Sequence, residues 1–245
     1  MSDSSRNAVA KDSAPPAPDS VHARQARRPS MLAFLNDPAN LFTLGGLGCG
    51  VLGIYFAVRG VFSAAMIAML WAVFFDWFDG PIARRTAGRT ADLRTFGGQL
   101  DSLVDIVSSG VCPAVVLLSY GQFNAWFLPG AFALIAAGAV RLSYFNAFGL
   151  ENDSTFLGLS IDNNSILVPL VFLLEGFVSH NVFAVTLYAT IAALAILNVA
   201  PFRMRKMQGP WYFVITVLVL GLTAVYGLRL STDLALIATG LEASS

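Results

Sequence analysis

The chain has 245 residues, of which 56% are hydrophobic and only 12% are charged. Soluble domains carry about 25% charged residues, so this composition excludes an ordinary soluble protein and predicts an integral membrane protein. Basic and acidic residues are equal in number, which leaves no net charge for nucleic-acid binding. Two histidines and two cysteines argue against a histidine-based metal centre and a disulfide framework.

The amino-terminal residues 1–30 are rich in Ser, Ala, Pro and charge and show no apolar periodicity. We expect them to form a disordered cytoplasmic tail. They lack the apolar stretch of a secretory signal peptide. Residues 31–42 then indicate a short interfacial helix with a turn at Asp37-Pro38.

Seven apolar stretches follow that are candidates for membrane crossings. They are Leu41–Val58, Val61–Arg84, Phe96–Tyr120, Ala125–Phe148, the short Ser165–Val178, Val182–Ala200 and Trp211–Leu228. The segments 85–95, 150–164 and 201–210 indicate loops, and Leu234–Leu241 is too short to cross and indicates an interfacial or re-entrant piece. We therefore expect an all-α membrane protein. Its six-helix transmembrane core would occupy residues 31–206, with one or two additional helices in 207–245.

Basic residues gather in loops that would share one side of the membrane. The loops after the second and sixth crossings hold Arg84, Arg85, Arg89, Arg94, Arg203, Arg205 and Lys206. The loops on the other side hold only Arg59, and Arg229 also falls there. The positive-inside rule therefore places the amino terminus and the basic loops in the cytoplasm.

Four aspartates interrupt the second and third crossings: Asp76, Asp79, Asp101 and Asp105. A charge at a helix centre costs on the order of 2.5–3.5 kcal/mol on insertion scales, and neighbouring carboxylates also repel each other. At spacings of three and four residues, each pair lies on one helix face. Two such helices packed together would converge four carboxylates. That arrangement predicts a two-metal centre for phosphoryl transfer, with Mg, Ca or Mn as the cation.

Small and basic residues accompany the aspartates on the same helices. Gly80 and Gly97 would let the phosphates of a ligand approach the backbone, and Arg84 could hold a phosphate with a bidentate fork. Two other interpretations of the acids are an interfacial position without function and a proton- or ion-translocating path. The two coherent stripes argue against the first, and the lack of an internal repeat argues against a membrane transporter.

The pattern Asp76-x2-Asp79-Gly80-x2-Ala83-Arg84 … Gly97-x3-Asp101-x3-Asp105 resembles the signature of the CDP-alcohol phosphatidyltransferases, over roughly residues 40–205. The resemblance implies a membrane enzyme, usually dimeric, with two divalent cations, Mg or Mn. Such an enzyme transfers a phosphatidyl group from CDP-diacylglycerol to a small alcohol and releases CMP, in phospholipid biosynthesis. It also implies a site at the cytoplasmic face of the membrane. We expect this membrane to be the inner membrane of a bacterium.

Carried over by motif position, the resemblance implies a role for each residue of the pattern. Asp76, Asp79 and Asp101 would be metal ligands, and Asp105 would complete the site and act as general base on the acceptor hydroxyl. Gly80, Ala83, Arg84 and Gly97 would border the CDP moiety and its phosphates.

Local blocks bear on the choice of acceptor alcohol. FGGQLDSLVDIVSSGVCPA and RLSYFNAFGL resemble phosphatidylserine synthases, although Gly158-Leu159-Ser160 stands where Gly-Leu-Pro is usual. DGPIAR followed by the long link Arg85–Phe96 is similar to bacterial phosphatidylcholine synthases. L-serine is thus the favoured acceptor, with choline, glycerol phosphate and inositol phosphate as alternatives.

Two polar sites outside the pattern have open interpretations. Arg141, within the fourth crossing, could hold a donor phosphate or the carboxylate of an acceptor serine, or form a structural ion pair with a site aspartate. Asp162, Asn163 and Asn164 could contact the acceptor or cap the following helix.

Overall fold

The structure is a computed structural model that describes residues 30–149, 155–205 and 209–242. The chain divides into two units, Met1–Asn36 and Asp37–Ser245. In the first unit, the described part is Ser30 and a 3-10 helix, η1 (Met31–Asn36). The tail predicted over residues 1–30 lies, apart from Ser30, outside the described residues.

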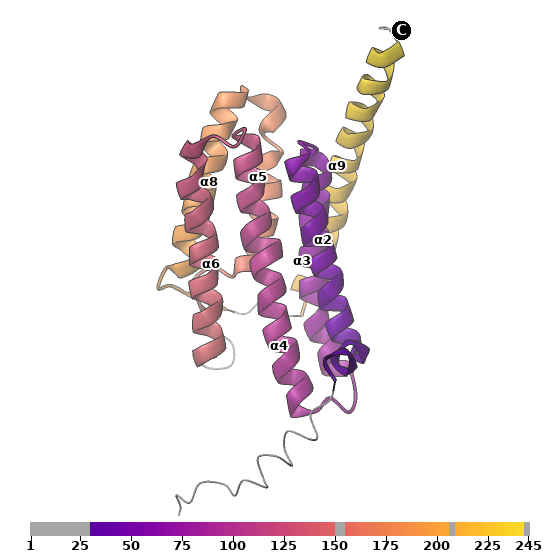
Figure 1. Cartoon of the computed structure of the whole chain (residues 1–245), viewed down its shortest axis with the longest axis vertical. Helices are drawn as coiled ribbons and strands as arrows, with labels where there is room; N and C mark the ends of the chain where they lie inside the picture. The colour runs from indigo at the N-terminus through magenta and orange to yellow at the C-terminus, as the bar shows by residue number, and fades with distance from the viewer. Residues whose placement is uncertain (1–29, 150–154, 206–208, 243–245) are drawn as a thin grey trace, which may run out of the picture. The chain divides into compact units, whose positions relative to one another are not determined.

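The second unit is a helical bundle (Figure 1). Its α-helices are α2 (Pro38–Val58), α3 (Phe62–Arg85), α4 (Ala91–Asp105), α5 (Cys112–Tyr120), α6 (Leu128–Phe148), α7 (Asn164–Phe172), α8 (His180–Val199) and α9 (Trp211–Glu242). Short helical segments lie between them: η2 (Ile106–Val111), η3 (Ala125–Phe127), η4 (Ile161–Asn163) and η5 (Glu175–Phe177). The prediction of an all-α fold is confirmed.

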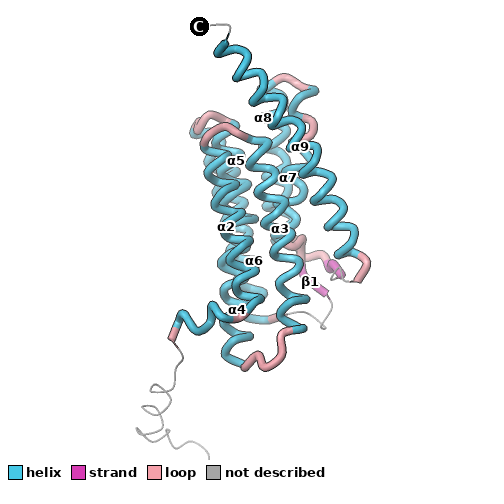
Figure 2. The backbone as a smooth tube through the Cα atoms, turned by 90° about the vertical axis from the view of Figure 1, so that its right-hand side faces the viewer, coloured by secondary structure: helices cyan, strands magenta, loops and turns pink. Residues whose placement is uncertain are grey.

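One short antiparallel strand pair interrupts segments that the sequence indicated as loops. Strand β1 (Thr155–Leu157) pairs with β2 (Arg203–Arg205), with Phe156 opposite Met204. Figure 2 shows this pair close to the start of α9. The ladder continues into Gly158, whose backbone N–H donates to the carbonyl of Phe202 at 2.8 Å.

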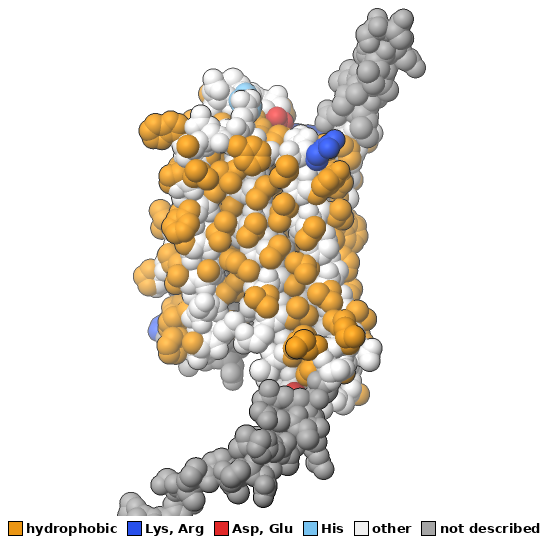
Figure 3. All heavy atoms as spheres, viewed as in Figure 1, with side chains coloured by type: hydrophobic (Ala, Val, Ile, Leu, Met, Phe, Trp, Pro, Cys, Tyr) orange, Lys and Arg blue, Asp and Glu red, His pale blue; other side chains and the backbone are white. Residues whose placement is uncertain are grey.

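Six helical stretches among the described residues are long and apolar enough to cross a membrane. They are Pro38–Val58, Phe62–Arg85, Ala91–Tyr120, Ala125–Phe148, His180–Val199 and Trp211–Ser231. Hydrophobic side chains cover the middle of the face in Figure 3, and charged ones appear only near its ends. An apolar exterior between polar ends is typical of a protein embedded in lipid, so the prediction of an integral membrane protein is confirmed.

The predicted fifth crossing, Ser165–Val178, is wrong as a continuous helix. The chain forms η4, the nine-residue α7 and η5 instead. The segment still runs antiparallel to α3, because Asp162 contacts Trp77 and Phe172 packs on Phe62, at opposite ends of α3. The free carbonyls at the end of α7 accept from Arg229 of α9, at 3.4 Å to Phe172 and 3.0 Å to Leu173. A helix can end there because these groups are satisfied.

Two further helix boundaries correct the sequence analysis. The polar link predicted over Arg85–Thr95 is mostly helical, because α3 includes Arg85 and α4 begins at Ala91. Thr90 caps α4, and its hydroxyl oxygen accepts from the N–H of Leu93 at 3.2 Å. The loop between α3 and α4 is therefore limited to residues 86–90. At the other end, Leu234–Leu241 is not a separate piece but the continuation of α9.

The third crossing is continuous from Ala91 to Tyr120 but contains a π-helical segment, η2, directly after Asp105. Such wide turns occur frequently at functional sites. Here the carbonyls of Ser108 and Ser109 accept from Ser165 and Asn164, each at 3.0 Å, and so bind the start of α7. On the opposite side Gly50 approaches so closely that a Cβ would lie 3.0 Å from the Cα of Ser108.

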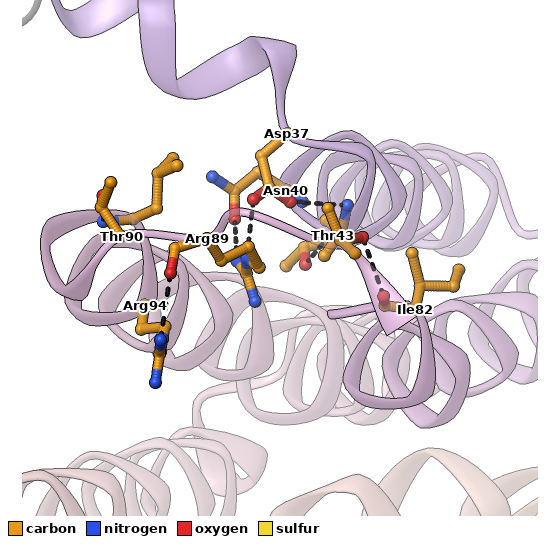
Figure 4. A network of polar contacts seen from close by, with 10 residues as sticks. Asp37, Asn40, Thr43, Ile82, Arg89, Thr90 and Arg94 are labelled. Atoms are coloured by element: carbon orange, nitrogen blue, oxygen red, sulfur yellow. Dashed lines mark hydrogen bonds and ion pairs between the residues drawn. The ribbon is translucent and has the colours of Figure 1, made fainter. Parts of the chain in front are cut away.

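A polar network joins the start of α2 to the loop between α3 and α4 (Figure 4). One carboxylate oxygen of Asp37 accepts from the N–H groups of Ala39 and Asn40, at 2.9 and 3.4 Å. Its other oxygen accepts from Arg89 Nε at 2.6 Å, with the side chain of Asp37 only 2% exposed. A buried carboxylate needs such donors, so this ion pair fixes α2 against the α3–α4 connection.

We expect Arg89→Met to lower the thermal unfolding temperature of the protein in detergent, because it leaves the carboxylate of Asp37 buried without its cation. The expected cost is about 1–3 kcal/mol, below that of breaking a fully buried pair because the backbone donors to Asp37 remain. Arg94→Met is the matched control, since Arg94 is exposed and its hydrogen-bond acceptor among the described residues is the carbonyl of Arg89. Equal unfolding temperatures for the two variants would contradict this account.

Candidate metal centre and its cavity

A cavity of about 300 Å³ lies among the second half of α3, α4, the second half of α6, η4 and the start of α9. All four motif aspartates line it: Asp76, Asp79, Asp101 and Asp105. The two predicted helical stripes therefore meet at one cavity, although not all four carboxylates converge on one point. Among the described residues, the basic side chains that line the same cavity are those of Arg84 and Arg141.

Three of the carboxylates are close enough to hold one ion. Asp76, Asp101 and Asp105 each place a carboxylate oxygen within 4.8 Å of the others. Asp76 and Asp105 also lie within hydrogen-bonding reach of each other. Like charges at this separation repel strongly in a medium of low polarity, so the cluster needs a proton or a cation between its oxygens.

Asp79 stands beside this group of three rather than within it. Its side chain is within hydrogen-bonding reach of Asp101. Its Oδ2 accepts from the hydroxyl of Thr43 on α2 at 2.6 Å. Thr43 also lies 3.0 Å from the carbonyl of Ala39, but one hydroxyl has one proton, and the shorter contact to a carboxylate is the stronger. α2 thus orients Asp79 through a residue that the sequence analysis missed.

The residues predicted to border the CDP moiety divide between two cavities. Gly80 and Arg84 line the cavity of the aspartates. Ala83 lines a second one of about 380 Å³, shared with Arg84 and with Thr86, Gly88, Arg89 and Arg94. Gly97 lines neither, and a Cβ there would lie 2.8 Å from Arg89 and 2.9 Å from Asn40. The structure thus places Gly97 against the polar network of α2.

Arg141 is 9% exposed and projects from α6 into the cavity. The carboxylates of Asp162 and Asp105 are near enough to interact with it electrostatically. Burial of a guanidinium inside an apolar bundle is costly without such negative charge. This position agrees with both sequence interpretations, a ligand contact and an ion pair with a site aspartate.

Three more residues outside the motif positions line the cavity, and the sequence analysis proposed a site role for Asp162 alone among them. Trp77 was interpreted as a packing or lipid-facing residue, but it lines the cavity and its Nε1 donates to Asp162 at 3.0 Å. Tyr212 of α9 accepts from Arg84 at 3.2 Å and packs edge-on against Trp77. The side chains near the start of α7 do not cap it. Asp162 lines the cavity instead.

The donor set of this cavity fits a hard divalent cation. Among the described residues, the candidate ligands are carboxylate oxygens, which suit Mg or Mn. His180, the one histidine that the structure describes, stacks on Tyr120 and does not line the cavity. The cavity is also large enough for part of a ligand beside the carboxylates. An arrangement of acids and arginines at the end of a membrane bundle can hold a phosphate-containing ligand and a cation together.

Comparisons with known proteins agree with this chemistry. The family model for CDP-alcohol phosphatidyltransferase matches residues 37–239. The chain is 35% identical to an archaetidylserine synthase of Methanothermobacter thermautotrophicus, over 58% of this chain and 59% of the relative. It is 31% identical to a CDP-diacylglycerol–serine O-phosphatidyltransferase of Helicobacter pylori, over 56% and 57%. It is 26% identical to a phosphatidylcholine synthase of Rhizobium meliloti, over 64% and 67%.

The match thus spans less than two thirds of the length of the two serine-type relatives. The family match covers most of this chain and includes every residue of the motif, from Asp76 to Asp105. The chain belongs to the CDP-alcohol phosphatidyltransferase family.

Proposed function

We propose that the protein transfers a phosphatidyl group from CDP-diacylglycerol to the hydroxyl of L-serine and releases CMP. The observation that carries the proposal is the cavity in which the motif carboxylates meet two arginines. The choice of acceptor is supported by the two more similar relatives, which are named as an archaetidylserine synthase and a CDP-diacylglycerol–serine O-phosphatidyltransferase. The phosphatidylcholine synthase of Rhizobium meliloti is less similar, at 26% identity.

In this proposal Asp76, Asp79, Asp101 and Asp105 hold one or two divalent cations, Mg or Mn. When bound, the cations screen the negative charge of the donor's pyrophosphate and of the departing CMP. Thr43 keeps Asp79 turned toward the cavity, and Arg84, steadied by Tyr212, contacts a phosphate oxygen of the donor.

Asp105 acts as the general base of the transfer. Its carboxylate takes the proton of the acceptor hydroxyl as the hydroxyl oxygen attacks the phosphorus that bears the diacylglycerol. The bond from that phosphorus to the CMP oxygen breaks, and CMP leaves. Asn164 and Ser165 donate to the carbonyls of Ser109 and Ser108 and so hold the π-helical segment that follows Asp105.

We further propose that the site opens to the cytoplasm and that the protein is a homodimer of the bacterial inner membrane. The orientation is supported by Arg84, Arg85, Arg89 and Arg94, which lie at the end of the bundle where the cavity is. A cytoplasmic opening would give access to CDP-linked lipid and to a water-soluble acceptor.

The assay is CMP release from CDP-diacylglycerol by the purified protein with L-serine and Mg or Mn. We expect Asp105→Asn to lower kcat by about 10²–10⁴, the range of a general base, because the amide cannot accept the hydroxyl proton. Thermal unfolding of the variant checks that it is folded. Undiminished turnover in a folded variant would rule out Asp105 as the base.

We expect Asp76→Ala to abolish activation by Mg or Mn over the range that saturates the original protein, because it removes one of three converging carboxylates. The measurement is the initial rate of CMP release against metal concentration. Full metal-dependent activity in Asp76→Ala would refute the role of this residue as a ligand.

Thr43→Val removes the hydroxyl that orients Asp79 but keeps the side-chain shape. We expect the metal concentration for half-maximal rate to rise about tenfold or more, because residues that orient metal ligands contribute this much to affinity. Thr43→Ser retains the donor and should restore affinity to within about threefold. If Thr43→Val and Thr43→Ser require the same metal concentration for half-maximal rate, the hydroxyl of Thr43 does not orient a metal ligand.

A further inference from the structure

Asp162 is a fifth carboxylate in the cavity, outside the family motif. It lies in η4, is 9% exposed, and is not one of the three carboxylates that converge within 4.8 Å. Its Oδ2 accepts from Nε1 of Trp77, the residue next to Asp76. The indole is held in turn by its edge-on contact with Tyr212, at 5.8 Å between ring centroids. The side chain of Asp162 is therefore fixed at the cavity wall.

The bond to Trp77 does not by itself require a charged residue. An indole N–H donates as well to the amide oxygen of an asparagine as to a carboxylate. The charge is costly here, since Asp162 interacts unfavourably with Asp76, Asp101 and Asp105. A carboxylate at this position is explained if it faces a positive charge, which Arg141, a ligand or both can supply.

Arg141 and Asp162 form a pair of opposite charges beside the proposed base. Both line the cavity, and Asp105 interacts electrostatically with each of them. If the hydroxyl of a bound molecule reaches Asp105, the other groups of that molecule lie near the cation of Arg141 and the anion of Asp162. L-serine carries a hydroxyl, an ammonium and a carboxylate on three adjacent carbons, and the groups of the cavity are their complements.

We propose that Asp162 binds the ammonium group of the acceptor and that Arg141 binds its carboxylate, so that the cavity selects a zwitterionic hydroxy amino acid. This inference rests on the proposed transfer to serine and assigns its specificity to two residues outside the motif. Acceptors that lack one charge would bind less well: ethanolamine lacks the carboxylate, 3-hydroxypropionate lacks the ammonium, and choline lacks the carboxylate and the N–H donors.

The test measures CMP release with L-serine, ethanolamine, 3-hydroxypropionate or choline as the acceptor. It compares the original protein with Asp162→Asn and Arg141→Gln. For Asp162→Asn we expect the KM for L-serine to rise about ten- to hundredfold, with kcat within about threefold, because one charge-assisted hydrogen bond is lost while the Trp77 bond remains. The preference for L-serine over 3-hydroxypropionate should fall by a similar factor. Arg141→Gln should instead reduce the preference for L-serine over ethanolamine.

The exposed acid Asp92, in the first turn of α4, gives the matched control Asp92→Asn, for which KM should not change. A KM for L-serine within twofold of the original in Asp162→Asn would overturn the inference and leave the proposed transfer standing. So would an equal loss of kcat with all acceptors, which indicates a role at the carboxylate cluster. Preference of the original protein for choline or ethanolamine over L-serine would overturn both the proposed transfer and this inference.

Discussion

Repulsion among buried carboxylates is the constraint on which the account of this protein depends. Asp76, Asp101 and Asp105 place oxygens within 4.8 Å of each other, with Asp79 and Asp162 in the same cavity. An apolar bundle does not hold such charges together unless something positive lies between them. Neighbouring groups position several of these carboxylates. A π-helical segment follows Asp105, the hydroxyl of Thr43 donates to Asp79, and the indole N–H of Trp77 donates to Asp162.

Long-range contacts supply that positioning from every side of the cavity. α2 contributes Thr43 and reaches the α3–α4 loop through Asp37 and Arg89. α7 binds the π-helical carbonyls. α9 lines the cavity with Tyr212, and its Arg229 donates to the carbonyls at the end of α7. The contacting residues of α2, α7 and α9 lie outside the motif, so residues outside the motif help to shape the site.

The sequence alone predicted the parts of this structure that follow from local pattern. Apolar length gave the membrane helices, and helical spacing brought Asp76, Asp79, Asp101 and Asp105 to one cavity. It missed Thr43, Trp77 and Tyr212 because each acts through a partner 36 to 128 positions away, as in the bonds Thr43–Asp79 and Arg84–Tyr212. The break in the predicted fifth crossing could not be predicted from the sequence either, because Arg229 from another helix, rather than a local signal, stabilises the end of α7.

The central claim is that the converged carboxylates bind a divalent cation, and direct binding of Mn tests it without reference to turnover. The measurement is electron paramagnetic resonance of free Mn during titration of the purified protein in lipid nanodiscs. The account predicts saturable binding of one or two Mn per chain, weakened at least about tenfold in Asp101→Asn, as expected when a ligand is lost. Absence of saturable binding, or equal affinity in the original protein and in Asp101→Asn, would contradict it.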